Sequence, residues 1–133
     1  MAQEEYGALI LAAGKGTRMR SATPKVLQPL LGEPMLAYVE RALRPLVGER
    51  IWAVVGCGAE AVRAAFEGRL NFVEQREQLG TGHALMMAMP ALKAAGLRRV
   101  LVVNGDMPLV TSETLESFAE RGREAAVAVA SLM

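Results

Sequence analysis

The chain has 133 residues, of which 52% are hydrophobic and 22% charged, a composition typical of one globular domain with a buried core. Its 15 Lys and Arg residues nearly balance its 14 Asp and Glu residues, which argues against a nucleic-acid partner. A single cysteine, Cys57, and a single histidine, His83, exclude a disulfide framework, a cysteine-based zinc site and a multi-histidine metal cluster. No apolar run approaches the roughly 20 residues that span a bilayer, and the N-terminal segment does not resemble a secretory signal. We therefore expect a cytoplasmic protein with no membrane partner.

Apolar runs alternate with amphipathic segments along the chain. Short apolar runs bounded by turn residues predict buried strands, over residues 6–12, 51–55, 70–73, 98–103 and 125–130. Helical spacing predicts helices between them, over residues 34–47, 59–66, 83–95 and 114–121. Gly48 is a plausible stop for the first helix, although Pro45 could end its regular geometry earlier, and Thr111 or Ser112 can cap the last one. This alternation predicts an α/β fold with a doubly wound, mostly parallel sheet.

Three polar segments follow predicted strands, at residues 13–25, 74–82 and 104–108. Ligands of open parallel sheets bind beyond the carboxyl ends of the strands. We therefore expect the three segments to converge around one small ligand.

The first segment combines glycines with positive charge. Gly14 and Gly16 permit a close backbone approach, and exposed N–H groups in such a turn attract anions. The segment also carries three positive charges, on Lys15, Arg18 and Lys25. The negative charges of a triphosphate would neutralise them.

Other glycine-rich loops fit this segment less well. A Walker A motif requires a spacing that is absent here. A dinucleotide fingerprint requires a third glycine, where this chain has Met19, and this disfavours an NAD-binding oxidoreductase. A purely structural turn stays open as an alternative.

The second segment carries Gln75 and Gly80. A side-chain amide offers a donor and an acceptor together, which suits the edge of a pyrimidine, while a solvated turn is the alternative. His83 is expected to begin a helix rather than to act as a catalyst.

The third segment places Asp106 directly after a hydrophobic strand. Such a carboxylate suits Mg²⁺, which prefers a few carboxylates together with phosphate oxygens and water; the alternative is that Asp106 caps the following turn. Cys57 is expected to be a small buried residue rather than a nucleophile.

Taken together, three motifs resemble the sugar-phosphate nucleotidyltransferases, and most closely the N-terminal uridyltransferase domains of the bacterial bifunctional N-acetylglucosamine-1-phosphate uridyltransferase/glucosamine-1-phosphate acetyltransferases. The resemblance covers essentially the whole chain. The motifs are Leu11-x-x-Gly14-x-Gly16-Thr17-x-Met19 with Pro24-Lys25, Gln75-x-x-Gln78-x-Gly80-Thr81-x-His83-Ala84, and Gly105-Asp106-x-Pro108-Leu109. The chain departs from the family at Asn104, where the family often has an aromatic residue.

The resemblance implies a role for each matching residue. Arg18 would meet the outgoing pyrophosphate, Lys25 would meet the phosphate under attack, and Asp106 would bind Mg²⁺. Nucleotide binding would involve Leu11, Ala12, Ala13, Gly14, Lys15, Gly16, Gln75, Gly80, Thr81 and Gly105, with Gln75, Gly80 and Thr81 reading the uracil.

The resemblance also implies a Rossmann-like nucleotidyltransferase fold and a reaction. A sugar 1-phosphate oxygen would attack UTP, giving UDP-N-acetylglucosamine for peptidoglycan precursor synthesis and pyrophosphate. Residues 1–133 would be the nucleotide-binding half of the domain, a truncated piece without the sugar-binding half and the hexapeptide-repeat domain, and inactive alone if turnover needs both halves. A non-catalytic nucleotide-binding module and a molybdopterin guanylyltransferase-like or cytidylyltransferase-like protein stay open, as does a homo-oligomer of the full-length protein.

Overall fold

The computed structural model describes residues 6–13, 24–56 and 59–129. Its main sheet has four parallel strands in the order β5-β4-β1-β6. These strands are β1 (Tyr6–Leu11), β4 (Ile51–Gly56), β5 (Asn71–Gln75) and β6 (Arg99–Asn104). The predicted α/β class and parallel sheet are confirmed, because each strand returns to the sheet through a helical crossover.

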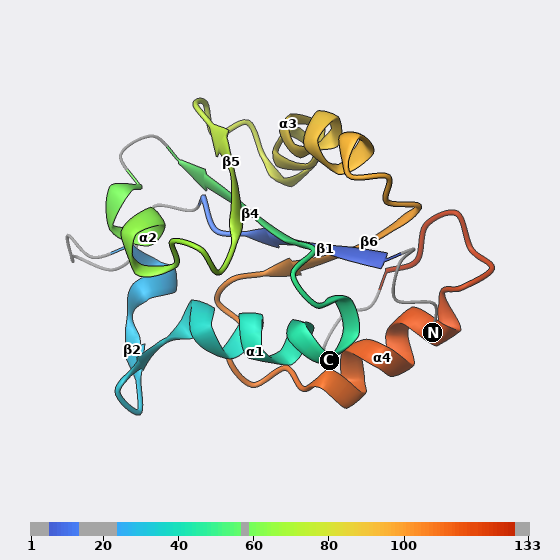
Figure 1. Ribbon diagram of the computed structural model, residues 1–133, viewed down its shortest axis with the longest axis horizontal. Helices are drawn as coiled ribbons and strands as arrows, with labels where there is room; N and C mark the ends of the chain where they lie inside the picture. Colours follow the sequence, from blue (N-terminus) through green and yellow to red (C-terminus); the bar gives the residue numbers. More distant parts are fainter. Residues whose placement is uncertain (1–5, 14–23, 57–58, 130–133) are drawn as a thin grey trace.

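Helices cover both faces of this sheet (Figure 1). The four helices of the described residues are α1 (Met35–Val47), α2 (Glu60–Ala65), α3 (Thr81–Ala94) and α4 (Ser112–Arg121). Helices α1 and α4 lie on one face and α3 on the other. The described part of the chain contains no helix that is long and apolar enough to cross a membrane.

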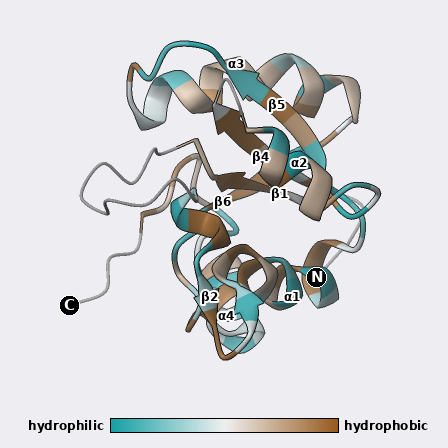
Figure 2. Ribbon diagram, turned by 90° about the vertical axis from the view of Figure 1, so that its left-hand side faces the viewer, coloured by the Kyte–Doolittle hydropathy of each residue, from teal (hydrophilic) through white to brown (hydrophobic). Residues whose placement is uncertain are grey.

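The central strand β1 shows why its sequence is almost continuously apolar. Ala8 and Ile10 pack into the cluster on the α1 side, whereas Leu9 packs against α3. All three side chains are fully buried, because successive residues of a strand point to opposite faces and both faces are covered. Figure 2 shows these hydrophobic strands between the two helical layers.

The segment between β1 and α1, expected to be loop, contains short regular pieces where it is described. The 3-10 helix η2 (Lys25–Leu27) is followed by a small antiparallel hairpin of β2 (Pro29–Leu30) and β3 (Glu33–Pro34). Helix α1 then runs through Pro45 to Val47. It ends at Gly48, whose positive φ of 62° suits glycine and whose N–H donates to the Arg44 carbonyl at 2.9 Å.

The prediction of a fifth strand over residues 125–130 is wrong for the part that the structure describes. Residues 125–129 form no strand, and Val127 and Val129 are 82% and 88% exposed. Arg99 Nη1 donates to the carbonyls of Gly122 and Ala125 at 3.3 and 3.1 Å, which draws the chain into a turn. An apolar run forms a strand only where a neighbouring strand accepts its backbone hydrogen bonds, and this segment has no such neighbour among the described residues.

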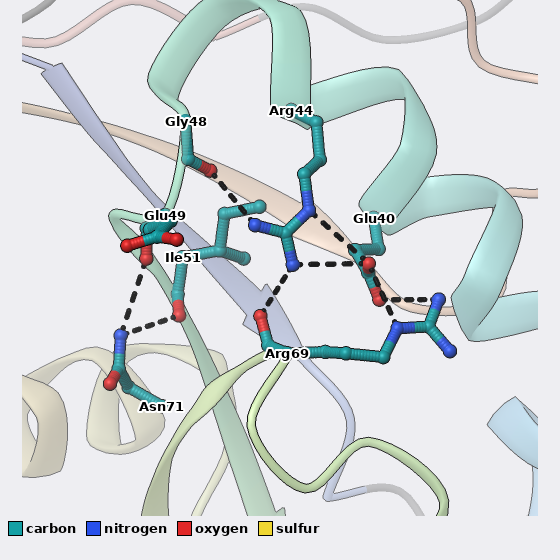
Figure 3. Close-up of polar contacts among 7 residues, drawn as sticks. All are labelled: Glu40, Arg44, Gly48, Glu49, Ile51, Arg69 and Asn71. Atoms are coloured by element: carbon teal, nitrogen blue, oxygen red, sulfur yellow. Dashed lines mark hydrogen bonds and ion pairs between the residues drawn. The ribbon is translucent and has the colours of Figure 1, made fainter.

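An ionic cluster around the buried Glu40 connects α1 to the segment that precedes β5 (Figure 3). Glu40 is 4% exposed, and its carboxylate accepts hydrogen bonds from Arg44 Nη2 and Arg69 Nε, each at 3.2 Å. Arg44 Nη2 also donates to the Arg69 carbonyl at 2.6 Å. The cluster therefore stabilises the end of the sheet opposite to the three polar segments.

Candidate functional site

The strand order places the carboxyl ends of β1 and β6 side by side. From β1 the chain moves outward through β4 to β5, and then returns to the other side of β1 as β6. Ligands of open parallel sheets bind beyond the carboxyl ends of the strands. The first and third polar segments follow β1 and β6.

The two segments meet at Gly105. Its N–H donates to the Leu11 carbonyl at 3.0 Å. A Cβ atom at residue 105 would lie 2.9 Å from Val26 Cγ1 and 3.3 Å from both Ile10 Cγ2 and the Leu11 carbonyl oxygen. Glycine is therefore required here by close packing, and this keeps the first and third segments in contact.

Lys25 and Asp106 form an ion pair at the carboxyl ends of β1 and β6. Lys25 Nζ lies 2.7 Å from Asp106 Oδ2, and the two side chains are 44% and 33% exposed. Lys25 belongs to η2 at the end of the first segment, whereas Asp106 follows β6. A partly exposed pair of this kind contributes little to stability, so both groups can exchange partners when a charged ligand arrives.

The second segment joins the site through Gln78. Its Nε2 donates to the Ala13 carbonyl at the start of the first segment. Gly56, at the carboxyl end of β4, makes room for this contact, since a Cβ there would lie 3.1 Å from Gln78 Nε2. Sequence reasoning gave no role to Gly56 or Gln78. The sequence signal for Gly56 was its position directly after the predicted strand over residues 51–55, and Gln78 belongs to the second of the three motifs.

Gln75 is buried at the end of β5, opposite Gly56 in the strand register. Its Nε2 donates to the Gly80 carbonyl at 3.3 Å and lies 2.9 Å from His83 Nδ1. Gly80 precedes α3 with a φ of 103°, a conformation that favours glycine. Thr81 begins α3 and is exposed. His83 lies in the first turn of the helix, as predicted.

The structure thus joins the ends of the three polar segments wherever they are described. Leu11, Ala12 and Ala13 complete β1 and its exit, and Ala12 N–H donates to the Val54 carbonyl at 2.9 Å. Several predicted residues lie outside the described residues, so their placement stays a prediction: Gly14, Lys15, Gly16, Arg18 and Cys57.

Comparison with known proteins identifies a nucleotidyltransferase fold. Residues 8–132 match the family described as MobA-like NTP transferase domain. The chain is 58% identical over 127 residues to the bifunctional protein GlmU of Nitratidesulfovibrio vulgaris, covering 95% of this chain and 28% of that relative. The chain therefore spans less than a third of the length of this curated relative.

Two solved structures share the architecture. A mannose-1-phosphate geranyltransferase from Thermus thermophilus superposes with a TM-score of 0.77 at 25% identity, covering 90% of this chain and 39% of that one. A nucleotidyl transferase from Methanothermobacter thermautotroptrophicus gives 0.72 at 28% identity, covering 87% and 57%. With a family match along nearly its whole length and a parallel sheet of the same architecture, the chain belongs to the MobA-like NTP transferase domain family.

Proposed function

We propose that this chain binds UTP and forms the nucleotide-binding half of a uridyltransferase that transfers UMP to N-acetylglucosamine 1-phosphate. The observation that carries the proposal is the Lys25–Asp106 ion pair at the carboxyl ends of β1 and β6. A cation and a carboxylate at this edge of the sheet support the proposal, because a nucleoside triphosphate and its metal ion require both kinds of group. The 58% identity to a bifunctional protein GlmU supports the choice of this reaction within the family.

The proposed reaction needs no nucleophile from the protein. An oxygen of the sugar 1-phosphate attacks the α-phosphorus of UTP, the bond from that phosphorus to the bridging oxygen breaks, and pyrophosphate leaves. The protein has to align the two substrates and stabilise the charge on the phosphates. Lys25 supplies one positive charge for this task, and Arg18 and Lys15 are proposed to supply others.

Asp106 is the proposed ligand of the metal ion. Within the described ranges no three His, Cys, Asp or Glu side chains gather around a common point, so the protein alone offers no complete metal cage there. This donor set fits Mg²⁺, which commonly takes one or two carboxylates and completes its shell with substrate phosphates and water. When bound, the ion would neutralise phosphate charge, and Lys25 would leave Asp106 for the nucleotide.

Residues 1–133 are proposed to supply nucleotide binding, whereas the sugar phosphate is bound by parts of the enzyme beyond this chain. Because the chain spans 28% of its relative, turnover is a property of the longer protein in this proposal. A pyrophosphate-release assay with N-acetylglucosamine 1-phosphate tests this division of labour. Multiple turnover by this chain alone would contradict it.

Isothermal titration with UTP and Mg²⁺ tests the binding proposal. We expect saturable binding by the parent chain, and a loss of roughly tenfold or more in affinity for Asp106→Asn, because the metal loses its charged ligand. The matched control is Glu116→Gln on the exposed surface of α4, which removes one negative charge from a helix that contributes no residue to the proposed site and should leave the affinity unchanged. Absence of UTP binding, or equal affinity for both variants, would refute the proposal, and tighter binding of CTP or GTP would assign another nucleotide.

A further inference from the structure

Three consecutive residues at the exit of β1 are each held by a different part of the chain. The Leu11 carbonyl accepts from the Gly105 N–H at 3.0 Å, and the Ala12 N–H donates to a carbonyl of β4 at 2.9 Å. The Ala13 carbonyl accepts from Nε2 of Gln78. Among these three contacts the last is the one made by a side chain, so a substitution can remove it and leave the other two in place.

The fold leaves room for the Gln78 amide beside the end of β4. Gln78 follows the end of β5, and Gly56 ends β4 in register with Gln75, the last residue of β5. A Cβ atom at residue 56 would lie 3.1 Å from Gln78 Nε2 and 3.4 Å from the Ala13 carbonyl oxygen. A side chain at this position would therefore press on the donor and the acceptor together, and glycine keeps their contact open.

The contact of Gln78 with Ala13 orients a peptide group and adds little to the core. Gln78 is exposed, and an exposed hydrogen bond contributes little to stability because water replaces either partner. The Ala13 side chain packs at the margin of the apolar cluster beneath α3, so its place does not depend on Gln78. The carbonyl does depend on it. Since a peptide group is planar, holding its oxygen sets the direction in which the chain enters the first polar segment.

We infer that Gln78 is a positioning residue, which fixes the Ala13 peptide group for the nucleotide and thereby makes binding by the first polar segment depend on the second. The inference rests on the proposed binding of UTP, in which Ala13 contacts the nucleotide. A site that already holds its bound geometry loses less conformational entropy when the ligand arrives. Without the Gln78 amide the nucleotide has to select one orientation of this peptide group, and its affinity falls by the fraction of chains that hold that orientation.

Isothermal titration with UTP and Mg²⁺ tests this role against a matched amide. Gln78→Ala should weaken binding roughly three- to tenfold, the effect of one hydrogen bond. The control is Asn71→Ala at the opposite end of β5. Asn71 is also exposed, and its Nδ2 donates to the Ile51 carbonyl of β4 at 3.1 Å. Its removal deletes the same kind of contact at the amino ends of the strands, so the UTP affinity should stay at the parent value.

Urea unfolding of the same two variants separates positioning from stability. Both lose one exposed hydrogen bond from an amide side chain to a backbone carbonyl, so their unfolding midpoints should shift by similar small amounts. Weaker UTP binding in Gln78→Ala alone is then an effect on the site. An equal loss of UTP affinity in Asn71→Ala would overturn the inference, because loss of stability would explain both results.

Gly56→Ala reaches the same contact by a second route. The added methyl group takes the space beside Gln78 Nε2 and displaces the amide, so UTP binding should weaken as it does in Gln78→Ala. In the double variant no amide is left to displace, and the affinity should equal that of Gln78→Ala alone. Losses that multiply in the double variant would overturn the inference, because the two substitutions would then act independently.

A spectroscopic test does not depend on any nucleotide. In a ¹H–¹⁵N spectrum the side-chain signals of Gln78 are the pair that vanishes in Gln78→Ala. We expect one proton of this pair to lie downfield in the parent chain, as a hydrogen-bonded amide proton does, and to return to the position of a free amide in Gly56→Ala. A free-amide position in the parent chain would overturn the inference whatever the titrations show.

The outcomes separate the inference from the proposed function. UTP binding by the parent chain with an unchanged affinity in Gln78→Ala overturns the role of Gln78 and leaves the proposed function standing. Failure of the parent chain to bind UTP removes the proposed function and this role of Gln78 together.

Discussion

Replacing Gly105 with alanine should destabilise the fold at the point where the first and third segments meet. The new Cβ would lie 2.9 Å from Val26 Cγ1, whereas carbon atoms pack best at about 3.5–4.0 Å. Val26 would have to retreat by about 0.6 Å or more, although it is itself 5% exposed. Insertion of a methyl group into a packed interior typically costs about 1–3 kcal/mol, and we expect Gly105→Ala to lower the free energy of unfolding by this amount.

Urea unfolding measures this cost against a matched control. Gly82 lies in α3, and a Cβ there would meet nothing within 4 Å, so Gly82→Ala should be neutral or should stabilise by up to about 1 kcal/mol. In a double-mutant cycle, Val26→Ala removes the atom that clashes, and the two substitutions should be coupled by about 0.5–2 kcal/mol. Parent-like stability of Gly105→Ala, or additivity with Val26→Ala, would refute the packing argument.

Two further predictions concern stability away from the site. Glu40→Gln should lower the free energy of unfolding by about 1–2 kcal/mol, because the buried acceptor loses its charge while Arg44 and Arg69 stay partly hydrated. Chemical denaturation measures this cost, and the exposed control Glu116→Gln should change the free energy of unfolding by less than about 0.5 kcal/mol. Equal costs for the two variants would contradict the stabilising role of the cluster. Leu31 has a φ of 51° and is 92% exposed. Because asparagine adopts this left-handed backbone conformation more readily than leucine, Leu31→Asn should raise the free energy of unfolding by roughly 0.5–1 kcal/mol and raise the Tm. A lower Tm would show that the leucine side chain has a packing role.

The parallel sheet could be predicted because strands buried on both faces leave a continuous apolar signal. β1 and β4 carry this signal and lie within the core. Residues 125–130 carry it too, yet no strand forms in the described part, since composition does not reveal whether a partner strand is present. In the hairpin, Pro29 pairs with Pro34 although both residues interrupt most strands. Proline is tolerated at edges, where its missing N–H is not needed.

The sequence indicated which segments would meet at the site, but not which of their side chains would contact each other. The position of Lys25 and Asp106 after strands indicated that they would share an edge of the sheet, but their ion pair depends on η2, which the sequence did not predict. The contact of Gln75 with His83 was missed for a different reason. It depends on the turn at Gly80 that aims α3 back toward β5, and single-residue patterns do not encode that direction.

The pairing of β1 with β6 has a consequence for how the protein is made. Among the described strands of the sheet, β1 comes first in the sequence and β6 last, so during synthesis one side of β1 lacks this partner until β6 emerges. Such distant pairing slows folding, and an unsatisfied strand edge invites mispairing in the meantime. Since Leu11 and Gly105 meet only in this closing step, a nucleotide bound as proposed would favour the completed sheet by mass action. The abundance of that nucleotide in the cell would then influence the yield of correctly folded chains.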